Sequence, residues 1–418
     1  MENIVEVAII GAGPYGLSLA AHLQAAGISL RIFGKPMNTW RDHMPKGMHL
    51  KSDGFASNLS APDADSTLKA YCQARGLGYA DKHRPVALQT FVAYADWFTA
   101  RHVPMLEASN VIGLEQTAEG FRLTLEDGEV CLARQVVLAV GITSFNHTPE
   151  VLAALPRPAL SHSFDHYEVS HFNGQEVIVV GAGASAIDTA VAIHEAGGKV
   201  RIVARAPSIV FHDAPAKPAL IETLKRPPSG IGPGWLSFLC VHAPLLFHRL
   251  SEKKRLAIVK RHLGPAPGWF MRERTEGKIE TVLGRAIAHA AMQDGRVRLT
   301  LSDGAMLEAD HIVAATGYRP LLSKLAFLDA PLRAKIASLA DTPVLARSFE
   351  TSVPGLYAVG PLAANSFGPL MRFMAGAEFA APHLAAHLVR RRTLERLLQR
   401  GRRKPAPRRA IALSASAR

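Results

Sequence analysis

Residues 7 to 20 read VAIIGAGPYGLSLA, an apolar run that passes through a glycine turn into an amphipathic stretch. Residues 177 to 190, VIVVGAGASAIDTA, repeat this arrangement in the middle of the chain. A buried parallel strand requires a continuous apolar run, and the first glycine permits a tight turn. The second glycine lets the backbone approach a pyrophosphate at the N-terminus of the next helix. The two stretches therefore predict two dinucleotide-binding sites.

The glycine spacing is complete in the first stretch, G-x-G-x-x-G, and takes the variant form G-x-G-x-x-A in the second. A single copy could be no more than a turn between a strand and a helix. Two copies, each after a β-branched strand and before a helix, favour nucleotide binding. The residues predicted to form the two turns are Gly11, Gly13 and Gly16 in the first and Gly181, Gly183, Ser185 and Ala186 in the second.

The composition is that of an ordinary globular enzyme. The 418 residues, 48% of them hydrophobic, suffice for two or three domains with cores of their own. Three cysteines, Cys72, Cys131 and Cys240, form no CxxC pair, which argues against a disulfide framework, a dithiol redox centre and a zinc site. The N-terminus lacks the basic and apolar segments of a signal peptide. We therefore expect a cytoplasmic protein without a membrane span or a bound metal.

The net charge of +13 is concentrated at one end of the chain. Residues 390–418 hold eleven Lys or Arg and one Glu, so the rest is nearly neutral. We expect residues 396–418 to form a disordered basic tail and predict no requirement for nucleic acid. Residues 231–247, IGPGWLSFLCVHAPLLF, are apolar but too short and too interrupted by proline for a transmembrane helix. Core or cavity wall is the favoured interpretation of this stretch.

The remaining segments indicate how the chain is divided. Residues 30–36, LRIFGKP, predict a second strand, with glycine where an acidic residue often binds a ribose. β-Meanders at 110–141 and 295–320 each end in an apolar strand and a glycine, and residues 352–388 predict a last strand, a glycine turn and a helix. This order predicts an α/β fold with two Rossmann-like dinucleotide-binding domains, the second inserted into the first. The predicted bounds are 1–160 and 321–395 for the first domain and 161–320 for the second.

Two further motifs, ATGYRP at 315–320 and PGLYAVG at 354–360, resemble those of the two-dinucleotide-binding flavoproteins and, within them, the class B monooxygenases. Residues 162–185 resemble a stretch of the flavin-containing monooxygenases. The resemblance implies that the first domain binds FAD and the second NAD(P)H. It also implies an FAD-dependent monooxygenase in which a C4a-hydroperoxyflavin, formed with NAD(P)H and O2, transfers one oxygen atom to a small-molecule substrate.

The same resemblance assigns cofactor-binding residues. Trp40, His49, Lys51 and Ser52 would lie beside the flavin, Gly360 near its phosphate or ribityl chain, and Thr316 and Gly317 beside the cofactors. Arg205 ends a predicted strand of the second domain, where an arginine can meet the 2′-phosphate of NADPH. Its alternative role is that of a solvated strand end.

Residues 43–59 and 368–384 resemble a branch of the family that includes an FAD-dependent urate hydroxylase. This resemblance implies hydroxylation of urate to 5-hydroxyisourate, with Lys51 and Arg372 as catalytic candidates beside the anion. Each could instead pair with the flavin or with a carboxylate. The alternatives are an N-hydroxylating, amine- or ketone-oxidising flavin monooxygenase and, in another class, a non-catalytic flavin or nucleotide sensor. A disulfide reductase would share both domains but would need a reactive dithiol.

Two other patterns favour structural roles. His162, His166 and His171 are four and five residues apart, and a loop packed between domains explains them better than a metal site. The aromatic residues of FVAYADWF, 91–98, predict a buried helix face.

Overall fold

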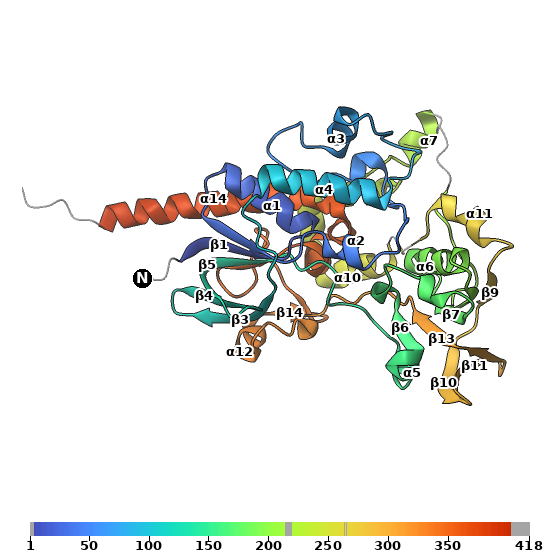
Figure 1. Cartoon of the computed structure of the whole chain (residues 1–418). Coiled ribbons are helices and arrows are strands. Elements are labelled where there is room, and N and C mark those ends of the chain that lie inside the picture. The colour runs from blue at the N-terminus through green and yellow to red at the C-terminus, as the bar shows by residue number, and fades with distance from the viewer. Residues whose placement is uncertain (1–3, 214–219, 263, 265, 403–418) are drawn as a thin grey trace, which may run out of the picture.

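The computed structural model describes residues 4–213, 220–262, 264 and 266–402. Two sheets organise them: a six-stranded sheet built from both ends of the chain and a five-stranded sheet built from its middle (Figure 1). We call the six-stranded sheet with its helices the first unit and the five-stranded sheet with its helices the second unit. The predicted α/β fold of two dinucleotide-binding folds, one inserted into the other, is confirmed.

The first sheet has the strand order β2-β1-β5-β4-β3, and β16 also pairs with β5. Its strands are β1 (Val5–Ile10), β2 (Leu30–Phe33), β3 (Val111–Thr117), β4 (Gly120–Leu125), β5 (Val130–Leu138) and β16 (Leu356–Ala358). Pairing of β1 with β2, and of β5 with β1 and β16, is parallel, whereas β3, β4 and β5 form the predicted antiparallel meander. The return segment thus places β16 beside a strand more than 200 residues earlier in the chain.

The second sheet is parallel throughout, in the order β6-β13-β7-β8-β9. Its strands are β6 (Leu160–His162), β7 (Glu176–Val180), β8 (Lys199–Ala204), β9 (Glu280–Leu283) and β13 (His311–Ala314). Three antiparallel strands, β10 (Ile287–Gln293), β11 (Arg296–Leu301) and β12 (Met306–Ala309), precede β13 as the second meander, and β14 (Ser338–Leu339) pairs with β15 (Thr342–Pro343).

The helices fall into three groups. Those of the first unit are α1 (Pro14–Ala25), α2 (Asn38–Asp42), α3 (Leu68–Ala74), α4 (Leu88–His102), α12 (Ala330–Lys335), α13 (Ala364–Phe367) and α14 (Ala377–Arg402). Next to the second sheet lie α5 (Glu150–Ala153), α6 (Ala184–Glu195) and α11 (Arg272–Thr275). Between β8 and β9 the chain also forms α7 (Leu220–Lys225), α8 (Trp235–His242), α9 (Pro244–His248) and α10 (Glu252–Arg261).

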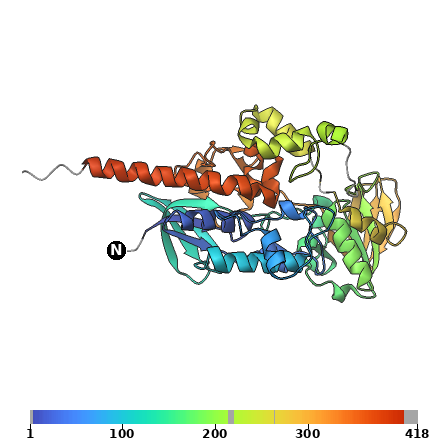
Figure 2. The same ribbon diagram turned by 90° about the horizontal axis from the view of Figure 1, so that it is seen from above.

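This last group leaves the second sheet and packs on the first unit. Helices α9 and α10 contact α13, and α8 contacts the short helix Pro369–Arg372. The His248 Nε2 atom lies 2.8 Å from the carbonyl oxygen of Leu345. Figure 2 shows these yellow-green helices projecting from one side of the molecule, next to α14. The insertion therefore bridges the two units.

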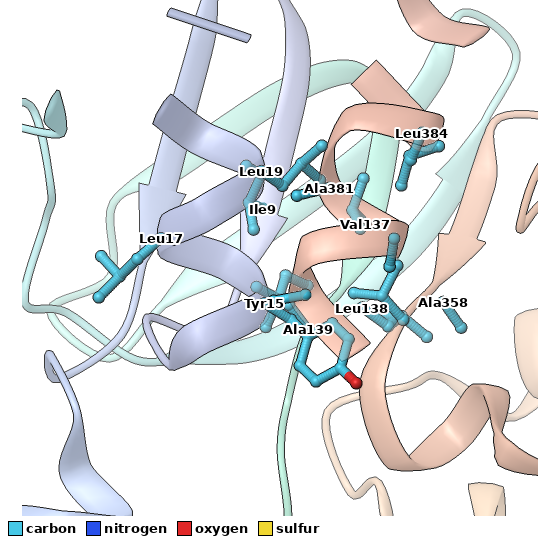
Figure 3. Close-up of a cluster of buried hydrophobic side chains, with 14 of the residues drawn as sticks. Ile9, Tyr15, Leu17, Leu19, Val137, Leu138, Ala139, Ala358, Ala381 and Leu384 are labelled. Carbon is cyan, nitrogen blue, oxygen red and sulfur yellow. The ribbon is translucent and has the colours of Figure 1, made fainter. Parts of the chain in front are cut away.

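The core of the first unit lies between its sheet and the helices α1 and α14. Figure 3 shows Leu19 of α1 and Ala381 and Leu384 of α14 above Ile9 and Val137 of the sheet, and all five side chains are buried. On α4, the aromatic face predicted from residues 91–98 is confirmed, because Phe91, Tyr94 and Phe98 are fully buried. No helix within the described ranges is long and apolar enough to cross a membrane.

The tail predicted to be disordered from residue 396 needs a correction. Helix α14 continues to Arg402, and the rest of the predicted tail lies outside the described residues. Glu6 explains part of this extension, because its carboxylate pairs with Arg392 at 3.6 Å and with Arg396 at 3.4 Å. Arginine and leucine are also good helix formers, so a basic composition does not exclude a helix.

Candidate active site

A single cavity of about 2950 Å³ runs between the two units and reaches both glycine turns. Drug-sized ligands occupy roughly 300–1,000 Å³, so this volume suits two dinucleotides and a small substrate better than one small molecule. Walls come from the first unit, the second unit and the loops that lead into α7 and α8. The cavity is therefore shaped by segments from three parts of the chain.

The first glycine turn connects β1 to α1. Gly11 has a φ of +114°, and a Cβ at Gly11 or Gly16 would overlap a backbone carbonyl, that of Ala139 or of Gly11 respectively. Both glycines are therefore required for the close packing of strand and helix. In contrast, a Cβ at Gly13 would meet nothing within 4 Å, and this residue lines the cavity. The turn is tight on its protein side and open on its cavity side, as a pyrophosphate cradle must be.

The second turn connects β7 to α6 in almost the same conformation. Gly183 has φ −87° and ψ −179°, against φ −89° and ψ −170° for Gly13. Gly181 has a φ of +144°, and a Cβ there would overlap the carbonyl of Ala315. Neither α1 nor α6 has a side-chain N-cap, so the first N–H groups of both helices are left for an anion. The residues at both turns thus fit a dinucleotide.

Lys51 of the first unit and Asp188 of α6 form a buried ion pair across the cavity wall. Burial raises the pKa of Asp188, and the neighbouring Lys51 ammonium opposes this shift. The second carboxylate oxygen, Oδ1, and the Thr189 hydroxyl are buried without a hydrogen-bond partner among the described residues. Both residues belong to the cavity wall beside the second turn.

The other residues predicted beside the flavin lie in two places. Trp40 and Ser52 line the main cavity, and the Trp40 ring packs on Phe91 with centroids 5.7 Å apart. The His49 side chain instead lines a smaller neighbouring cavity, and its ring contacts Phe270 of the main cavity wall. Trp40 and Ser52 thus line one cavity and His49 its neighbour. Direct flavin contact remains a prediction for each of the three.

The residues predicted around NAD(P)H line the cavity on the second unit. Arg205 follows β8, is exposed into the cavity and has no ion-pair partner among the described residues. Thr316 and Gly317 follow β13 and bind the segment around His147 that comes from the first unit. The Thr316 hydroxyl donates to the carbonyl of His147, and the His147 N–H donates to the carbonyl of Gly317 at 3.0 Å. The structure therefore brings Arg205, Thr316 and Gly317 to the cavity edge of the second sheet.

Gly360 is buried rather than on the cavity wall, which is formed there by Pro361. Its φ is +71°, and a Cβ would come within 3.3 Å of the Tyr15 ring. From the first glycine turn, the Tyr15 hydroxyl donates to the carbonyls of Phe373 at 2.8 Å and Met371 at 3.1 Å. Tyr15 thereby ties the return segment to the first turn.

Arg372 lies on this return segment, on the cavity wall and beside the Phe373 ring. Its guanidinium donates to the carbonyl of His262 at 2.7 Å, so the helical insertion holds it in place. Lys51 and Arg372, the two catalytic candidates, therefore share one cavity. Lys51 has the carboxylate of Asp188 as its partner, and a catalytic role remains a prediction for both Lys51 and Arg372.

The histidines and cysteines have structural settings. His166 and His311 both lie within hydrogen-bond distance of the Ser161 hydroxyl, at 2.6 and 2.7 Å, and no metal-binding group occurs among the described residues. Cys72, Cys131 and Cys240 are all buried and free, and burial raises the pKa of each thiol. None of the three lines the main cavity.

Sequence reasoning missed Asp188, Tyr15 and the contribution of residues 206–213 and 222–230 to the cavity. Asp188 could have been found as a carboxylate within the apolar helix that follows the second turn. A tyrosine directly before the third glycine gave no comparable signal, because its partners lie more than 350 residues away.

Comparisons with known proteins agree with this geometry. A family model described as pyridine nucleotide-disulphide oxidoreductase matches residues 8–226, just over half of the chain. The chain is 25% identical over 338 residues to the indole-3-pyruvate monooxygenase YUCCA1 of Oryza sativa subsp. japonica, covering 74% of this chain and 76% of the relative. It is 26% identical over 291 residues to a ferredoxin–NADP reductase of Gluconacetobacter diazotrophicus, with 69% of each chain covered. The FAD-dependent urate hydroxylase of Xanthomonas campestris pv. campestris matches only 200 residues at 27% identity, which is 45% of this chain and 42% of the relative.

Solved structures extend the likeness of fold to nearly the whole chain. The ornithine hydroxylase from Pseudomonas aeruginosa superimposes with a TM-score of 0.73 at 15% identity, covering 93% of this chain and 99% of that one. The cadaverine monooxygenase from Erwinia amylovora has a TM-score of 0.70 at 16% identity and covers 100% of this chain and 99% of that one.

The matched residues include both glycine turns and the first sheet except β16 and the first three residues of β1. The expected cofactors, FAD and NAD(P)H, agree with this family and with the two cradles. The chain is an FAD- and NAD(P)H-dependent oxidoreductase and belongs to the pyridine nucleotide-disulphide oxidoreductase family.

Proposed function

We propose that this protein is a monooxygenase that uses NAD(P)H and O2 to hydroxylate a small amine at nitrogen. One NAD(P)H, one proton and one O2 would be consumed for each hydroxylamine formed, with the second oxygen atom released as water. The observation that carries the proposal is the single cavity onto which both nucleotide cradles open. Electrons can then pass between two cofactors without a protein redox group.

The family contains enzymes with a dithiol, but this chain offers none. Its cysteines are scattered, buried and away from the main cavity, and their raised thiol pKa values disfavour the reactive thiolate. A disulfide reductase is therefore disfavoured. Bound FAD supplies the remaining chemistry, since a flavin accepts electrons from NAD(P)H and passes them to O2.

The chain's own part is to bind, orient and exclude water. The first turn would hold the FAD pyrophosphate, and the second turn, with Arg205, that of NAD(P)H. Lys51 keeps an ammonium at the cavity wall, and Asp188 holds it in place. Apolar residues such as Phe270 and Phe373 narrow the space for water.

Although cations outnumber carboxylates on the cavity wall, two exposed carboxylates there, Asp53 and Asp213, offer partners for a substrate ammonium group. Desolvation raises the pKa of Asp53, and Lys82 and His83 oppose this shift. A carboxylate in such a setting would be stabilised by a substrate ammonium group. The ornithine and cadaverine enzymes that share this fold act on amines by name, which supports the same choice.

Urate is the second candidate, and Arg372 favours it as a cation on the cavity wall. Its other proposed contact, Lys51, is paired with Asp188, which weakens the case for an anionic substrate. The match to a urate hydroxylase covers too little of the chain to favour urate over an amine.

The test is NADPH and NADH consumption by the purified, FAD-loaded protein in ¹⁸O2-enriched buffer. A panel of primary amines, ketones and urate would be supplied in turn, and products would be analysed by mass spectrometry. We expect an amine to stimulate consumption and to gain one ¹⁸O atom. Stimulation by urate with loss of its absorbance would instead support the second candidate. Consumption matched by hydrogen peroxide for every compound would contradict a monooxygenase.

Asp53→Asn sharpens the substrate assignment. It should raise KM for the amine about tenfold, the usual effect of one charge-assisted contact, with little change in NAD(P)H oxidation without substrate. Asp81→Asn is the matched control, because Asp81 is exposed and lies outside the main cavity.

A further inference from the structure

Helices α8 and α9 present apolar side chains on two opposite faces. The inner face, Ser237, Cys240, Pro244 and Phe247, is buried against the rest of the protein. On the outer side, Trp235, Leu236, Leu239 and Leu246 have exposed fractions of 55%, 42%, 50% and 58%. We call these four residues the outer apolar face. A helix that is apolar all round is normally covered all round, so this face indicates a partner.

The spacing shows that this face is organised. Within α8, Trp235, Leu239 and His242 follow one another at intervals of four and three, which places them along one side of this helix. Ile221 and Leu224 of the neighbouring α7 are also exposed, at 66% and 71%. The sequence-based interpretation of residues 231–247 as core or cavity wall is thus correct for the inner side only.

The charge around the face identifies the kind of partner. Residues 220–262 contain eight Lys or Arg and two Glu. Five of these cations are exposed, lie outside the active-site cavity and have no ion-pair partner among the described residues: Arg249, Lys253, Lys254, Lys260 and Arg261. A second copy of this chain would bring the same cations against them. An anionic surface with an apolar interior would satisfy both the cations and the apolar face.

The segment that leads into the face also belongs to the active-site cavity. Arg226, Ser229 and Pro233, which precede α8, line that cavity. The outer apolar face therefore lies close in sequence to one wall of the active site.

We propose that the outer apolar face docks the protein on an anionic lipid membrane, with α8 and α9 lying in the plane of the interface. Trp235 would sit at the level of the headgroups, the leucines below it and these five cations against the lipid phosphates. The helices are far too short to cross the bilayer, so this is docking on one leaflet. The proposal rests on this face and stands whichever substrate is oxygenated.

The test is binding of the full-length, FAD-loaded protein to vesicles of phosphatidylcholine alone or mixed with phosphatidylglycerol, measured by sedimentation. Leu239→Gln should lower partition onto the anionic vesicles by about tenfold or more, because burial of one leucine is worth roughly that factor. Leu394→Gln is the matched control, since Leu394 on α14 is at least as exposed as Leu239, at 61% against 50%, but lies outside the face. Equal binding of both variants and wild type would overturn the proposal.

A second readout separates docking by the face from attraction of the basic C-terminal segment. The emission of Trp235, obtained by subtracting a Trp235→Phe variant, should shift to shorter wavelength on anionic vesicles only. Binding without this shift would assign the attraction to other cations and overturn the proposal. Sedimentation velocity without lipid gives the last outcome: a dimer that Leu239→Gln dissociates would assign the face to self-association instead. Flavin absorbance reports the fold in every variant.

Discussion

The two glycine turns have almost the same backbone but different attachments to the protein. Each leads from a parallel strand into a twelve-residue helix without a side-chain N-cap. In the first, Tyr15 bonds to the return segment and the Ser18 hydroxyl accepts the N–H of Ser60 at 2.9 Å. The equivalent positions in the second are Ser185, on the cavity wall, and Asp188, paired with Lys51 of the other unit.

This difference separates two kinds of nucleotide site. The first turn is fastened to segments of its own unit, as suits a cofactor that stays bound. In the second turn, the helix carries a charged contact across the cavity, so the geometry of that site depends on how the two units meet. We therefore expect the same local motif to hold the resident FAD at the first turn and the exchanging nicotinamide nucleotide at the second.

The largest expected effect tests the third position of the motif. Gly16→Ala should lower the free energy of unfolding by about 4 kcal/mol or more and abolish FAD binding, because the new Cβ overlaps the carbonyl of Gly11 in a fixed turn. Ala186→Gly, its mirror change, should cost only about 1 kcal/mol, the helix-propensity difference. Flavin content after gel filtration and urea unfolding would measure both. A Gly16→Ala protein that keeps its flavin would break the comparison.

The next effect concerns the contact between units. Asp188→Asn leaves the Lys51 ammonium without its carboxylate and should cost about 3 kcal/mol, the lower end for a buried pair because Lys51 is partly exposed. Flavin reduction by NAD(P)H, followed by stopped flow, should slow by about tenfold or more. Combining Asp188→Leu with Lys51→Met should restore stability but not the reduction rate. Recovery of both would make the pair purely structural.

A similar change in the free energy of unfolding is expected when His166 of the second unit is protonated. Burial, reinforced by His171 and His311, lowers the pKa of His166 to about 4 from an ordinary value near 6.5. Between pH ~6.5 and about 4 the unfolded chain protonates His166 and the folded chain does not, so the free energy of unfolding is full above pH ~6.5 and falls as the pH decreases towards about 4. The loss should approach about 3 kcal/mol. Urea unfolding across this range should become less pH-dependent in His166→Gln, whereas an unchanged profile would exclude this residue.

The next, smaller effect is on nucleotide binding and compares Arg205, after β8, with Lys35, after β2. These are the strands that follow the two glycine turns. Arg205→Ser should raise KM for NADPH by about tenfold to a hundredfold while leaving NADH almost unaffected, because only NADPH has a 2′-phosphate. Lys35→Ser, the matched change after β2 of the first unit, should alter neither value. Equal effects of Arg205→Ser on both nucleotides would make Arg205 a solvated strand end.

The smallest effect concerns Tyr15. Tyr15→Phe keeps the ring under Gly360 but removes the bonds to Met371 and Phe373, which should cost about 1 kcal/mol and weaken FAD binding a few-fold. Ser185→Ala should leave FAD binding unchanged. Flavin fluorescence titration of the apoprotein would distinguish them, and an equal response would contradict the different attachment of the turns.

Much of the fold could be predicted because its signals are local. An apolar run before each glycine turn, the alternating meanders and the aromatic face of α4 are each contained within about thirty residues, and hydrophobic period and turn chemistry decide them. The cofactor cradles follow from the same local rules. Even the insertion of one unit into the other could be predicted from the order of these segments.

Contacts between distant segments were decided only by the tertiary structure. Lys51 meets Asp188 across 137 positions, and Tyr15 reaches carbonyls more than 350 residues away. Local composition also gave the wrong end for α14, whose last turns are held by Glu6. In residues 231–247 the pattern showed an apolar segment, but only packing divided it into a buried and an exposed side. The conformation that a residue prefers depends on its neighbours in the sequence, so it can be predicted locally. The residues that its side chain contacts depend on how separate helices and strands pack together.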